Sequence, residues 1–465
     1  MRRYLILLIA IFTTVSLEAQ LFKAKRYVKF PDEKGYLYRL TLKDKKDTPY
    51  KLTHPEKYLS SRAIERRNRQ GLGIDSTDLP ITPKYLKKIS ETGSHIISKS
   101  KWNNTVLVKV TDSSAVDRLK ALSCVKSTQL LWITPDSIEM MDGRSKLSEA
   151  QSSPSITKYG VGEEQISMLN GIQLHDAGFR GRGMIIAVID GGFNNADSIP
   201  LFNNIHILGC KDFAYPQNGN VFAEADHGTL VLSCMATNQP NTFIGTAPEA
   251  SYWLLRSEYT AYESRVEEDY WSAAVEFADS VGVDVINSSL GYHSFDDKAL
   301  SYRYEDLDGK TALISRTASL LACKGIILCN SMGNDGVMSW KKMNVPADAE
   351  DILSVGAVSM NKENALFSAV GPTADWRVKP DVMAAGMPAR VINSKGELSQ
   401  SSGTSLASPV LCGMVACLWQ AFPNKTAYEI MDLVRRSGDT VEHPNSIFGY
   451  GIPDFWKAYQ IGLQQ

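Results

Sequence analysis

The stretch MIIAVID, residues 184–190, is an almost continuous apolar run that ends in Asp190 and is followed by two glycines. A run without polar alternation is typical of a strand that is covered on both faces of a parallel sheet. Three later runs have the same character and are separated by helical patterns: VDVINSSLG (283–291), GIILCNSMG (325–333) and ILSVGAV (352–358). From about residue 160 the sequence therefore predicts an α/β domain with a mainly parallel central sheet.

The first part of the chain has a different pattern. It is rich in lysine and arginine, with a predicted helix at SSRAIERRNRQ (60–70), a strand at TVLVKV (105–110), and then a turn at Asp112 and an amphipathic helix. These elements predict a small α+β domain, and the polar, turn-rich stretch that follows is typical of a linker. The predicted division is a signal segment, a first domain, a linker and a second domain, at residues 1–19, 20–140, 141–159 and 160–465.

The N-terminus has the order of a secretory signal. Arg2 and Arg3 precede an apolar run over residues 4–12, and smaller and polar residues then lead to Ala19, where we expect cleavage. The apolar run is too short to span a bilayer, although an uncleaved N-terminal anchor is the alternative. No later stretch approaches 18 uninterrupted apolar residues. We therefore expect an exported protein, periplasmic or extracellular, whose mature form has no membrane partner.

The composition is that of a globular protein, with 465 residues of which 43% are hydrophobic and 22% charged. A formal net charge of -1 provides no basic field for nucleic acid, which we exclude as a partner. The seven cysteines lie mostly in apolar runs, where cysteine behaves as a small hydrophobe, and none has zinc-site spacing with histidine. We expect buried thiols and no cofactor, and the sequence leaves structural calcium open.

Two side chains stand where chemistry is expected. Catalytic groups gather beyond the carboxyl ends of parallel strands, and Asp190 ends its run beside a glycine turn, although a turn cap is the alternative. His227 stands at the start of an apolar helical pattern, EADHGTLVLSCMA (224–236). The helix dipole favours a neutral imidazole there, as a general base requires. A helix-start residue bonded to its own turn is an equal alternative.

A serine-rich stretch, SSGTSLASPVLCG (401–413), supplies a possible nucleophile. Gly403 and Thr404 predict a tight turn, Ser405 is the predicted first residue of a helix, and Pro409 is expected in its first turn. The Ser405 hydroxyl would then lie at the positive end of the helix, near unpaired N–H groups. The alternative is a helix N-cap, which fits better for the neighbouring Ser401, Ser402 and Ser408.

The three candidates complete one another. A serine hydroxyl needs a base to take its proton, and a histidine serves well only when a carboxylate orients it. The chain offers them in the order Asp190, His227, Ser405, which is one of the known orders of a convergent triad. Ser405 does not lie in the G-x-S-x-G elbow of the α/β-hydrolases, so that class of esterase is excluded.

The motifs, taken in order, resemble those of the subtilisin-like serine proteases, the subtilases: AVIDGG (187–192), HGT (227–229), VINSSLG (285–291), NSMGNDG (330–336) and SGTSLASP (402–409). A further segment, FGYGIPDFWKAY (448–459), resembles the end of that family's catalytic domain. In the first domain, YLSSRAIERRNRQGLGIDSTDLPIT (58–82) resembles the pro-regions of exported subtilases from Bacteroidetes-type bacteria.

The resemblance implies a three-layer subtilisin-like fold preceded by a small α+β pro-segment, and a serine endopeptidase activity. It implies Ser405 as nucleophile, His227 as general base and then acid, and Asp190 as the residue that orients His227. Asn334 matches the family's side-chain oxyanion donor, which acts with the backbone N–H of Ser405. The substrate-binding positions that the family implies are Ser289, Leu290, Gly291 and Gly333.

The resemblance also implies partners: protein or peptide substrates, and the chain's own pro-segment as an inhibitor until processing yields a monomeric enzyme. Glu267 and Glu268 fall near a substrate-contact segment, where we expect a solvated helix start, with a subsite for a basic residue or a free amine as the alternative. Leu230 and Leu406 stand where many members have histidine and methionine. A catalytically inactive peptide-binding scaffold and an acid-acting relative that uses Glu and Asp are the rival interpretations.

Overall fold

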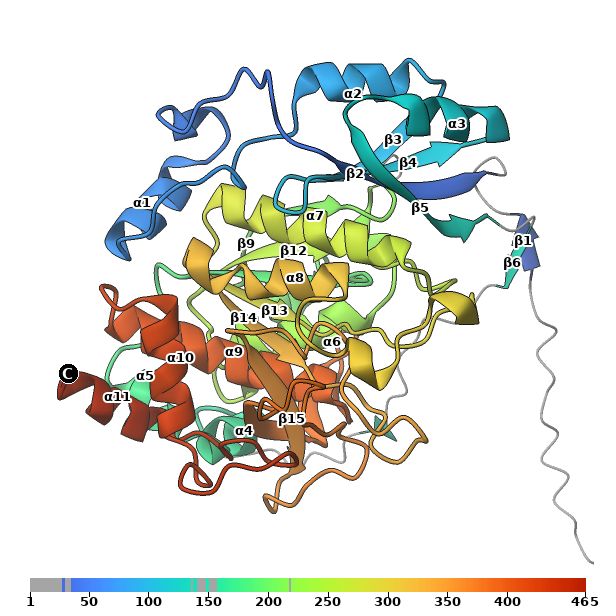
Figure 1. Cartoon of the computed structure of the whole chain (residues 1–465). Helices are drawn as coiled ribbons and strands as arrows, with labels where there is room; N and C mark the ends of the chain where they lie inside the picture. Colours follow the sequence, from blue (N-terminus) through green and yellow to red (C-terminus); the bar gives the residue numbers. More distant parts are fainter. Residues whose placement is uncertain (1–26, 30–34, 135–136, 140–147, 150–156, 217–218) are drawn as a thin grey trace, which may run out of the picture.

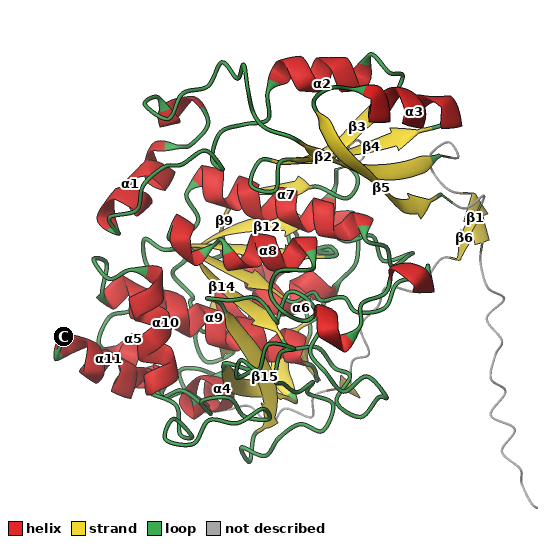
Figure 2. Ribbon diagram, viewed as in Figure 1, coloured by secondary structure: helices red, strands yellow, loops and turns green. Residues whose placement is uncertain are grey.

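The computed structural model describes residues 27–29, 35–134, 137–139, 148–149, 157–216 and 219–465. The predicted signal segment and most of the predicted linker lie outside these residues. The described chain forms two parts, an N-terminal part at the top of Figures 1 and 2 and a larger C-terminal part below it.

A seven-stranded sheet lies at the centre of the C-terminal part, in the order β16-β15-β14-β13-β8-β12-β9, and every neighbouring pair is parallel. This confirms the predicted α/β class. The predicted runs correspond to β8, β13, β14 and β15, whereas β9, β12 and β16 were not predicted. The bounds are β8 Ile185–Asp190, β9 His206–Asp212, β12 Ser251–Arg256, β13 Val285–Ser288, β14 Ile327–Ser331, β15 Leu353–Ser359 and β16 Val382–Met387.

Helices cover both faces of this sheet, which gives three layers. Alternate residues of a strand point to opposite faces: Ile186 and Val188 of β8 pack in a core with α6 and α9, whereas Ala187 and Ile189 pack in a second core with α7 and α8. The helices of the first face are α4 Glu163–Met168, α5 Gly171–Asp176, α6 His227–Ala236, α9 Thr404–Ala421, α10 Ala427–Arg436 and α11 Phe455–Leu463, and those of the second are α7 Val266–Val281 and α8 Leu313–Ser319.

Helix α9 is the centre of the first face. It is the one helix in the described ranges that is long and apolar enough to cross a membrane, but 83% of it is buried inside the protein. Its apolar character is therefore explained by its place as the core helix under the sheet.

The N-terminal part is an antiparallel sheet in the order β3-β4-β2-β5 with two helices on its outer face (Figure 1). This agrees with the predicted α+β character. A separate helix, α1, and a short helix, η1, lie in the connection between β2 and α2. The bounds are β2 Tyr36–Leu42, η1 Pro55–Lys57, α1 Ser61–Arg69, α2 Pro83–Ser90, β3 His95–Ser100, β4 Thr105–Val110, α3 Ser113–Ala121 and β5 Val125–Ile133.

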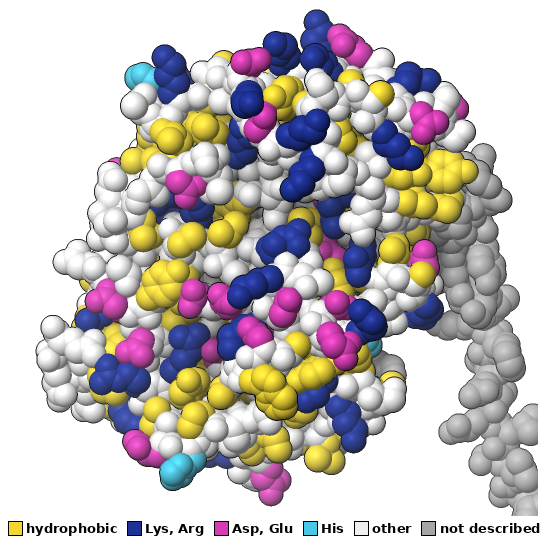
Figure 3. Space-filling view, viewed as in Figure 1, with side chains coloured by type: hydrophobic (Ala, Val, Ile, Leu, Met, Phe, Trp, Pro, Cys, Tyr) yellow, Lys and Arg dark blue, Asp and Glu magenta, His cyan; other side chains and the backbone are white. Residues whose placement is uncertain are grey.

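The inner face of the N-terminal sheet packs on the beginning of α7 through an apolar contact of Leu37, Leu107 and Leu131 with Val266 and Tyr270. In the space-filling view, Lys and Arg side chains are prominent on the N-terminal part at the top, and Asp and Glu side chains lie among them there and on the part below (Figure 3). The two parts therefore meet through buried apolar side chains, and a buried ion pair between Arg39 and Asp269 lies at the same interface.

Short elements complete the described chain. The small strands pair as β1 with β6, β10 with β11, and β17 with β18 and β7. Their bounds are β1 Tyr27–Lys29, β6 Ser137–Glu139, β7 Ser148–Glu149, β10 Asn238–Gln239, β11 Phe243–Ile244, β17 Ala389–Ile392 and β18 Leu398–Ser401, and the 3-10 helices are η2 Pro200–Phe202, η3 Val221–Ala223, η4 Lys298–Leu300, η5 Tyr304–Asp306 and η6 Ala322–Lys324.

Candidate active site

Asp190 is the last residue of β8, at the carboxyl edge of the parallel sheet, as predicted. Its side chain is fully buried, and Oδ1 accepts a hydrogen bond of 2.8 Å from the backbone N–H of Gly191. The carboxylate is therefore fixed by the turn that follows the strand.

His227 is the first residue of α6 and meets Asp190 at this edge. Its Nδ1 lies 2.9 Å from Oδ1 and 3.0 Å from Oδ2 of Asp190. An ionised carboxylate only accepts hydrogen bonds, so Nδ1 carries the proton and Nε2 is left to act as a base. The helix start is held against β8 because Gly228 donates its N–H to Gly192 O, where a Cβ on Gly228 would stand only 2.3 Å from that oxygen.

The charges around His227 act against the helix dipole, from which a neutral imidazole was expected. Burial lowers the pKa of His227, but the charge of Asp190 and its hydrogen bond raise it, with smaller contributions from Glu258 and Asp226, and the pKa rises to about 9. The expectation considered only the helix dipole, which is outweighed by a buried carboxylate in direct contact. The contact with Asp190 therefore favours the imidazolium form of His227.

Ser405 and Asn334 lie together at the start of α9. A Cβ placed on Gly403 would stand 2.9 Å from Ser405 Oγ and 3.7 Å from Asn334 Nδ2, so both atoms border the same point. Asn334 Oδ1 accepts from the backbone N–H (2.9 Å) and the hydroxyl (3.0 Å) of Thr404. These two bonds fix the amide oxygen at Thr404, while Nδ2 lies on the side of Gly403.

The expected position of Pro409 is wrong. Helix α9 begins at Thr404, one residue before Ser405, and Pro409 lies inside it and not in its first turn. Proline has no N–H, so it leaves the carbonyl four residues earlier without its helical partner. That carbonyl belongs to Ser405, and it accepts a hydrogen bond of 2.7 Å from the hydroxyl of Ser289.

The other serines of residues 401–413 do not lie beside Asn334 at the start of α9 as Ser405 does. Ser408 donates to Asn287 Oδ1 at 2.8 Å, and Asn287 Nδ2 donates to Ser289 Oγ at 3.0 Å, so Ser408 belongs to a buried network below the site. Ser401 ends β18, and Ser402 is exposed before the helix.

The predicted substrate-binding residues lie on two segments beside Ser405. Ser289, Leu290 and Gly291 directly follow β13, outside its regular hydrogen bonding, and Gly333 follows β14 with a φ of +104°. Gly291 and Gly333 both border Asn344, because a Cβ on either would lie within 2.9 Å of its side chain. Their binding of substrate stays a prediction.

The expected solvated helix start at Glu267 and Glu268 is wrong. Both side chains are fully buried. Glu267 accepts 3.0 Å hydrogen bonds from the backbone N–H groups of Tyr259 and Ser264, so it closes the loop before α7, and burial raises its pKa. Glu268 accepts a hydrogen bond of 2.5 Å from the hydroxyl of Tyr302.

Glu258 is a candidate residue that the sequence analysis missed. It lies two residues beyond β12, whose last residue, Arg256, is paired with Asp190, and its Oε2 stands 3.1 Å from the point that a Cβ on Gly191 would occupy. Burial and Asp190 raise the pKa of Glu258 to about 7, although His227 acts in the opposite direction. No motif marks it, because only the pairing of β12 with β8 brings it to the site.

The described ranges contain no group of three His, Cys, Asp or Glu side chains that could hold a metal ion. All seven cysteines are free thiols, and two of them, Cys210 and Cys323, are exposed. The expectation of buried thiols therefore fits the other five.

Comparison with known proteins gives two family matches. The model of the subtilase family matches residues 181–451, and the model of the peptidase S8 propeptide domain of Bacteroidota matches residues 37–149. Subtilisin NAT of Bacillus subtilis subsp. natto is 27% identical over 368 residues, which cover 78% of this chain and 82% of that protein. The membrane-bound transcription factor site-1 protease of Rattus norvegicus is 28% identical over 303 residues, which cover 62% of this chain and 26% of that protein.

Proposed function

This chain belongs to the subtilase family and is a serine-type endopeptidase with an N-terminal propeptide domain, and we propose that it cuts peptide bonds through an acyl-enzyme on Ser405. The observation that carries this proposal is the pair of contacts of 2.9 and 3.0 Å between His227 Nδ1 and the buried Asp190 carboxylate. The contact leaves the other ring nitrogen free for the proton of a nucleophile at the same edge of the sheet.

In the first step, Ser405 Oγ attacks the carbonyl carbon of the peptide bond while Nε2 of His227 takes the hydroxyl proton. Asp190 stabilises the imidazolium that forms, and the raised pKa of His227 expresses the same stabilisation. His227 then gives the proton to the leaving amine. Water repeats the sequence on the ester and releases the second product.

The negative oxygen of the tetrahedral intermediate needs donors that are already in position. Two groups support an oxyanion hole. The side-chain oxygen of Asn334 is held by Thr404, while its Nδ2 lies on the side of Gly403. The backbone N–H of Ser405 lies in the first turn of α9, where N–H groups have no carbonyl partner within the helix.

The N-terminal region supports a zymogen. Its propeptide match and its packing on α7 fit a pro-segment that inhibits the peptidase domain. The basic and apolar order of residues 2–12 supports export to the periplasm or the exterior, with a signal cut near Ala19. Substrates are proteins or peptides, and the mature enzyme is proposed to be a monomer without cofactor.

The test is labelling by a fluorophosphonate, which reacts with an activated serine. The wild-type chain should be labelled, Ser405→Ala should not, and Ser402→Ala, an exposed serine three residues away, should be labelled as the wild type is. Sequencing the new N-terminus of the processed protein should locate the cut within residues 141–165. Equal labelling of Ser405→Ala would refute the mechanism, and unlabelled wild type would favour the inactive scaffold. Activity confined to acid pH would favour the acid-acting relative.

A further inference from the structure

Part of the pro-segment reaches a region of the peptidase domain far from the candidate site. We call residues 55–82 the arm; they include η1, α1 and the loop after α1. In Figure 1 helix α1 lies apart from the four-stranded sheet, beside one end of α7. The arm therefore adds contacts to those of the four-stranded sheet, and the two sets meet at Asp279, which Lys101, directly after β3, also contacts at 3.6 Å.

Two arginines of the arm share one carboxylate of the peptidase domain. Arg66 Nη2 lies 2.5 Å from Asp279 Oδ1, and Arg67 contacts both oxygens, with Nη1 3.0 Å from Oδ1 and Nη2 3.1 Å from Oδ2. All three side chains are fully buried. Burial raises the pKa of Asp279, but Arg66, Arg67 and Lys101 outweigh it and lower the pKa to about 2. The contact is therefore ionic at physiological pH.

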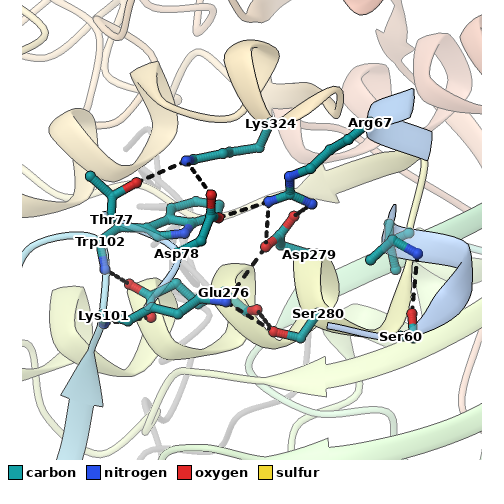
Figure 4. Close-up of polar contacts among 12 residues, drawn as sticks. Ser60, Arg67, Thr77, Asp78, Lys101, Trp102, Glu276, Asp279, Ser280 and Lys324 are labelled. Carbon is teal, nitrogen blue, oxygen red and sulfur yellow. Dashed lines mark hydrogen bonds and ion pairs between the residues drawn. The ribbon is translucent and has the colours of Figure 1, made fainter. Parts of the chain in front are cut away.

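Beside this contact the charges are reversed, with a cation of the peptidase domain bound by carboxylates of the arm. Lys324, at the end of η6 in the peptidase domain, points into the loop of the arm, where its Nζ lies 3.0 Å from Asp78 Oδ2, 3.1 Å from Asp75 Oδ2 and 2.8 Å from Thr77 Oγ1. Arg67 also donates to Asp78 Oδ1 at 2.9 Å, which joins the two arrangements (Figure 4). Each part thus supplies a buried charge that the other part neutralises.

The arm also holds backbone groups of the peptidase domain. Arg62 donates to the carbonyls of Gly282 and Gly183 at 2.9 and 2.8 Å and to Asp284 Oδ2 at 2.5 Å. Gln70 donates to the carbonyl of Gly325 at 2.9 Å. Gly282 and Gly325 end α7 and η6 with positive φ, and a Cβ on them would stand 2.8 and 2.6 Å from arm side chains.

These contacts lie at the edge of the sheet opposite to the catalytic one. Asp284 directly precedes β13 and Gly183 lies two residues before β8, whereas Asp190 ends β8. A strand of six residues spans about 20 Å. The arm therefore cannot take part in blocking the candidate site and has to act in another way.

Buried charges make this surface selective. A buried ion left without its partner is strongly unfavourable, so Asp279 and Lys324 fit a partner that brings both two cations and an anion in this geometry. Two linked contact areas, the sheet on α7 and the arm, also hold more strongly than either alone, because the second stays at a high local concentration when the first opens.

We propose that the arm is a second anchor, and that the surface around Asp279 and Lys324 is its docking site, which keeps the cut pro-segment on the peptidase domain. The consequence for activity rests on the proposed function: an enzyme whose linker has been cut stays inhibited until the arm is released or degraded. The anchoring itself does not depend on catalysis and is tested without it.

The experiment uses the full chain with Ser405→Ala, so that it cannot process itself. A recognition sequence for a site-specific protease is placed in the linker, within residues 141–147, and a tag on the pro-segment immobilises the protein. After the linker is cut, release of the peptidase domain is followed by interferometry. The variants are Arg67→Met and Arg62→Met, and the matched control is Lys84→Met, whose ion pair with Asp47 is exposed, at 60% and 67%.

We expect the unsubstituted arm and Lys84→Met to retain the peptidase domain equally. Release should be about 100-fold faster in Arg67→Met, since the buried carboxylates of Asp279 and Asp78 each lose one of their cationic partners. It should be about tenfold faster in Arg62→Met, whose side chain is partly exposed. Thermal unfolding of each uncut chain shows whether the variant folds. If Arg67→Met does not fold, the release rate of Arg62→Met decides the test. Equal release rates, or immediate release without any substitution, overturn the proposal.

A parallel series with Ser405 intact separates the two proposals. There the arm variants should shorten the delay between linker cleavage and peptidase activity. A chain that is never active refutes the proposed function and leaves the release rates valid. An active chain whose delay is unchanged by Arg62→Met and Arg67→Met, despite faster release, refutes the inhibitory consequence of the anchor.

Discussion

Gly403→Ala is expected to damage catalysis while leaving the fold intact. Gly403 directly precedes α9 with a φ of 164°, which is extended backbone that alanine also adopts. The new methyl carbon would stand 2.9 Å from Ser405 Oγ, and real Cβ atoms essentially never approach so closely. The atom that has to move is therefore the nucleophile itself.

The size of the effect follows from that distance. Ordinary contact begins at 3.4 Å, so Ser405 Oγ is displaced by about 0.5 Å or rotates to another position. About 0.5 Å is the tolerance of a catalytic constellation, and a displacement of about 1 Å can cost about 100-fold in rate. We expect kcat/KM to fall by about 10- to 100-fold, or ~1.4 to ~2.7 kcal/mol of transition-state stabilisation.

The stability of the folded Gly403→Ala variant should increase slightly or stay unchanged, although its activity falls. Replacing glycine by alanine at a compatible φ stabilises a protein by ~0.4 to ~1 kcal/mol through the unfolded chain. The next neighbour of the new carbon, Asn334 Nδ2, lies at an ordinary 3.7 Å. The melting temperature of the variant should therefore equal that of the wild type or exceed it slightly.

The assay combines hydrolysis of labelled casein with the rate of fluorophosphonate labelling, on enzyme matured where necessary by a trace of the wild type. Gly219→Ala is the control, since its Cβ would meet nothing closer than 3.6 Å and should leave both rates unchanged. Full activity of Gly403→Ala would refute the reasoning. So would a loss of activity that matches a loss of folded protein, because the effect would then be structural.

Three further expectations concern the same site. Asn334→Ala should lower kcat by about 100- to 1000-fold with little change in KM in steady-state kinetics, which is the cost known in this family for the loss of one oxyanion-hole donor; an unchanged kcat would remove Asn334 from the oxyanion hole. Because His227 must lose its proton to act as a base, kcat/KM should rise with pH up to about 9, and Glu258→Gln, which removes a negative charge near the imidazole, should shift this limb to lower pH in a pH–rate profile. An unshifted limb would contradict the role of Glu258. Leu406, buried beside the nucleophile, cannot be oxidised as methionine can, so hydrogen peroxide should inactivate the enzyme slowly, and rapid loss with an intact fold would contradict this.

The strands that the sequence predicted are buried on both faces, although β16, which is buried nearly throughout, was missed. Runs such as residues 184–190 are apolar at every position because α6 and α9 cover one face and α7 and α8 the other. The strand β9 escaped prediction because it is the edge of the sheet and alternates exposed and half-buried residues in HILGCKD. For β9, its position at the edge of the sheet therefore explains why its sequence lacks a continuous apolar run.

The catalytic candidates were found where a local rule and a resemblance agreed. Asp190 and His227 stand at a strand end and a helix start, and both places were recognised from their own surroundings. The pKa of His227 was not predictable, since it depends on a carboxylate 37 residues away in the sequence. Asn334 came from the resemblance alone, and Thr404, which holds its amide, gave no signal of its own.

Buried charge was the main failure of prediction from sequence. Glu267 and Glu268 have the local pattern of an exposed helix start, and Arg66 and Arg67 belong to a basic, polar helix. All four are fully buried, because their partners come from elsewhere: a loop that folds back, Tyr302, and Asp279, which lies 213 residues from Arg66. From sequence alone a charged side chain is predicted to be exposed, because such side chains are rarely buried without a partner. The partner is identified only by the tertiary structure.

Pro409 shows how one local violation can serve the site. A proline inside a helix removes a hydrogen bond and ordinarily destabilises the helix by ~3 kcal/mol or more. Here the bond that is missing belongs to the carbonyl of Ser405, and the hydroxyl of Ser289 replaces it at 2.7 Å. Ser289 is also the first residue of the segment predicted to bind substrate. The residue that carries the nucleophile is therefore hydrogen-bonded directly to the segment that would position the peptide. Pro409→Ala restores an N–H that competes for the Ser405 carbonyl, so it would weaken this hydrogen bond without altering Ser289 or Ser405.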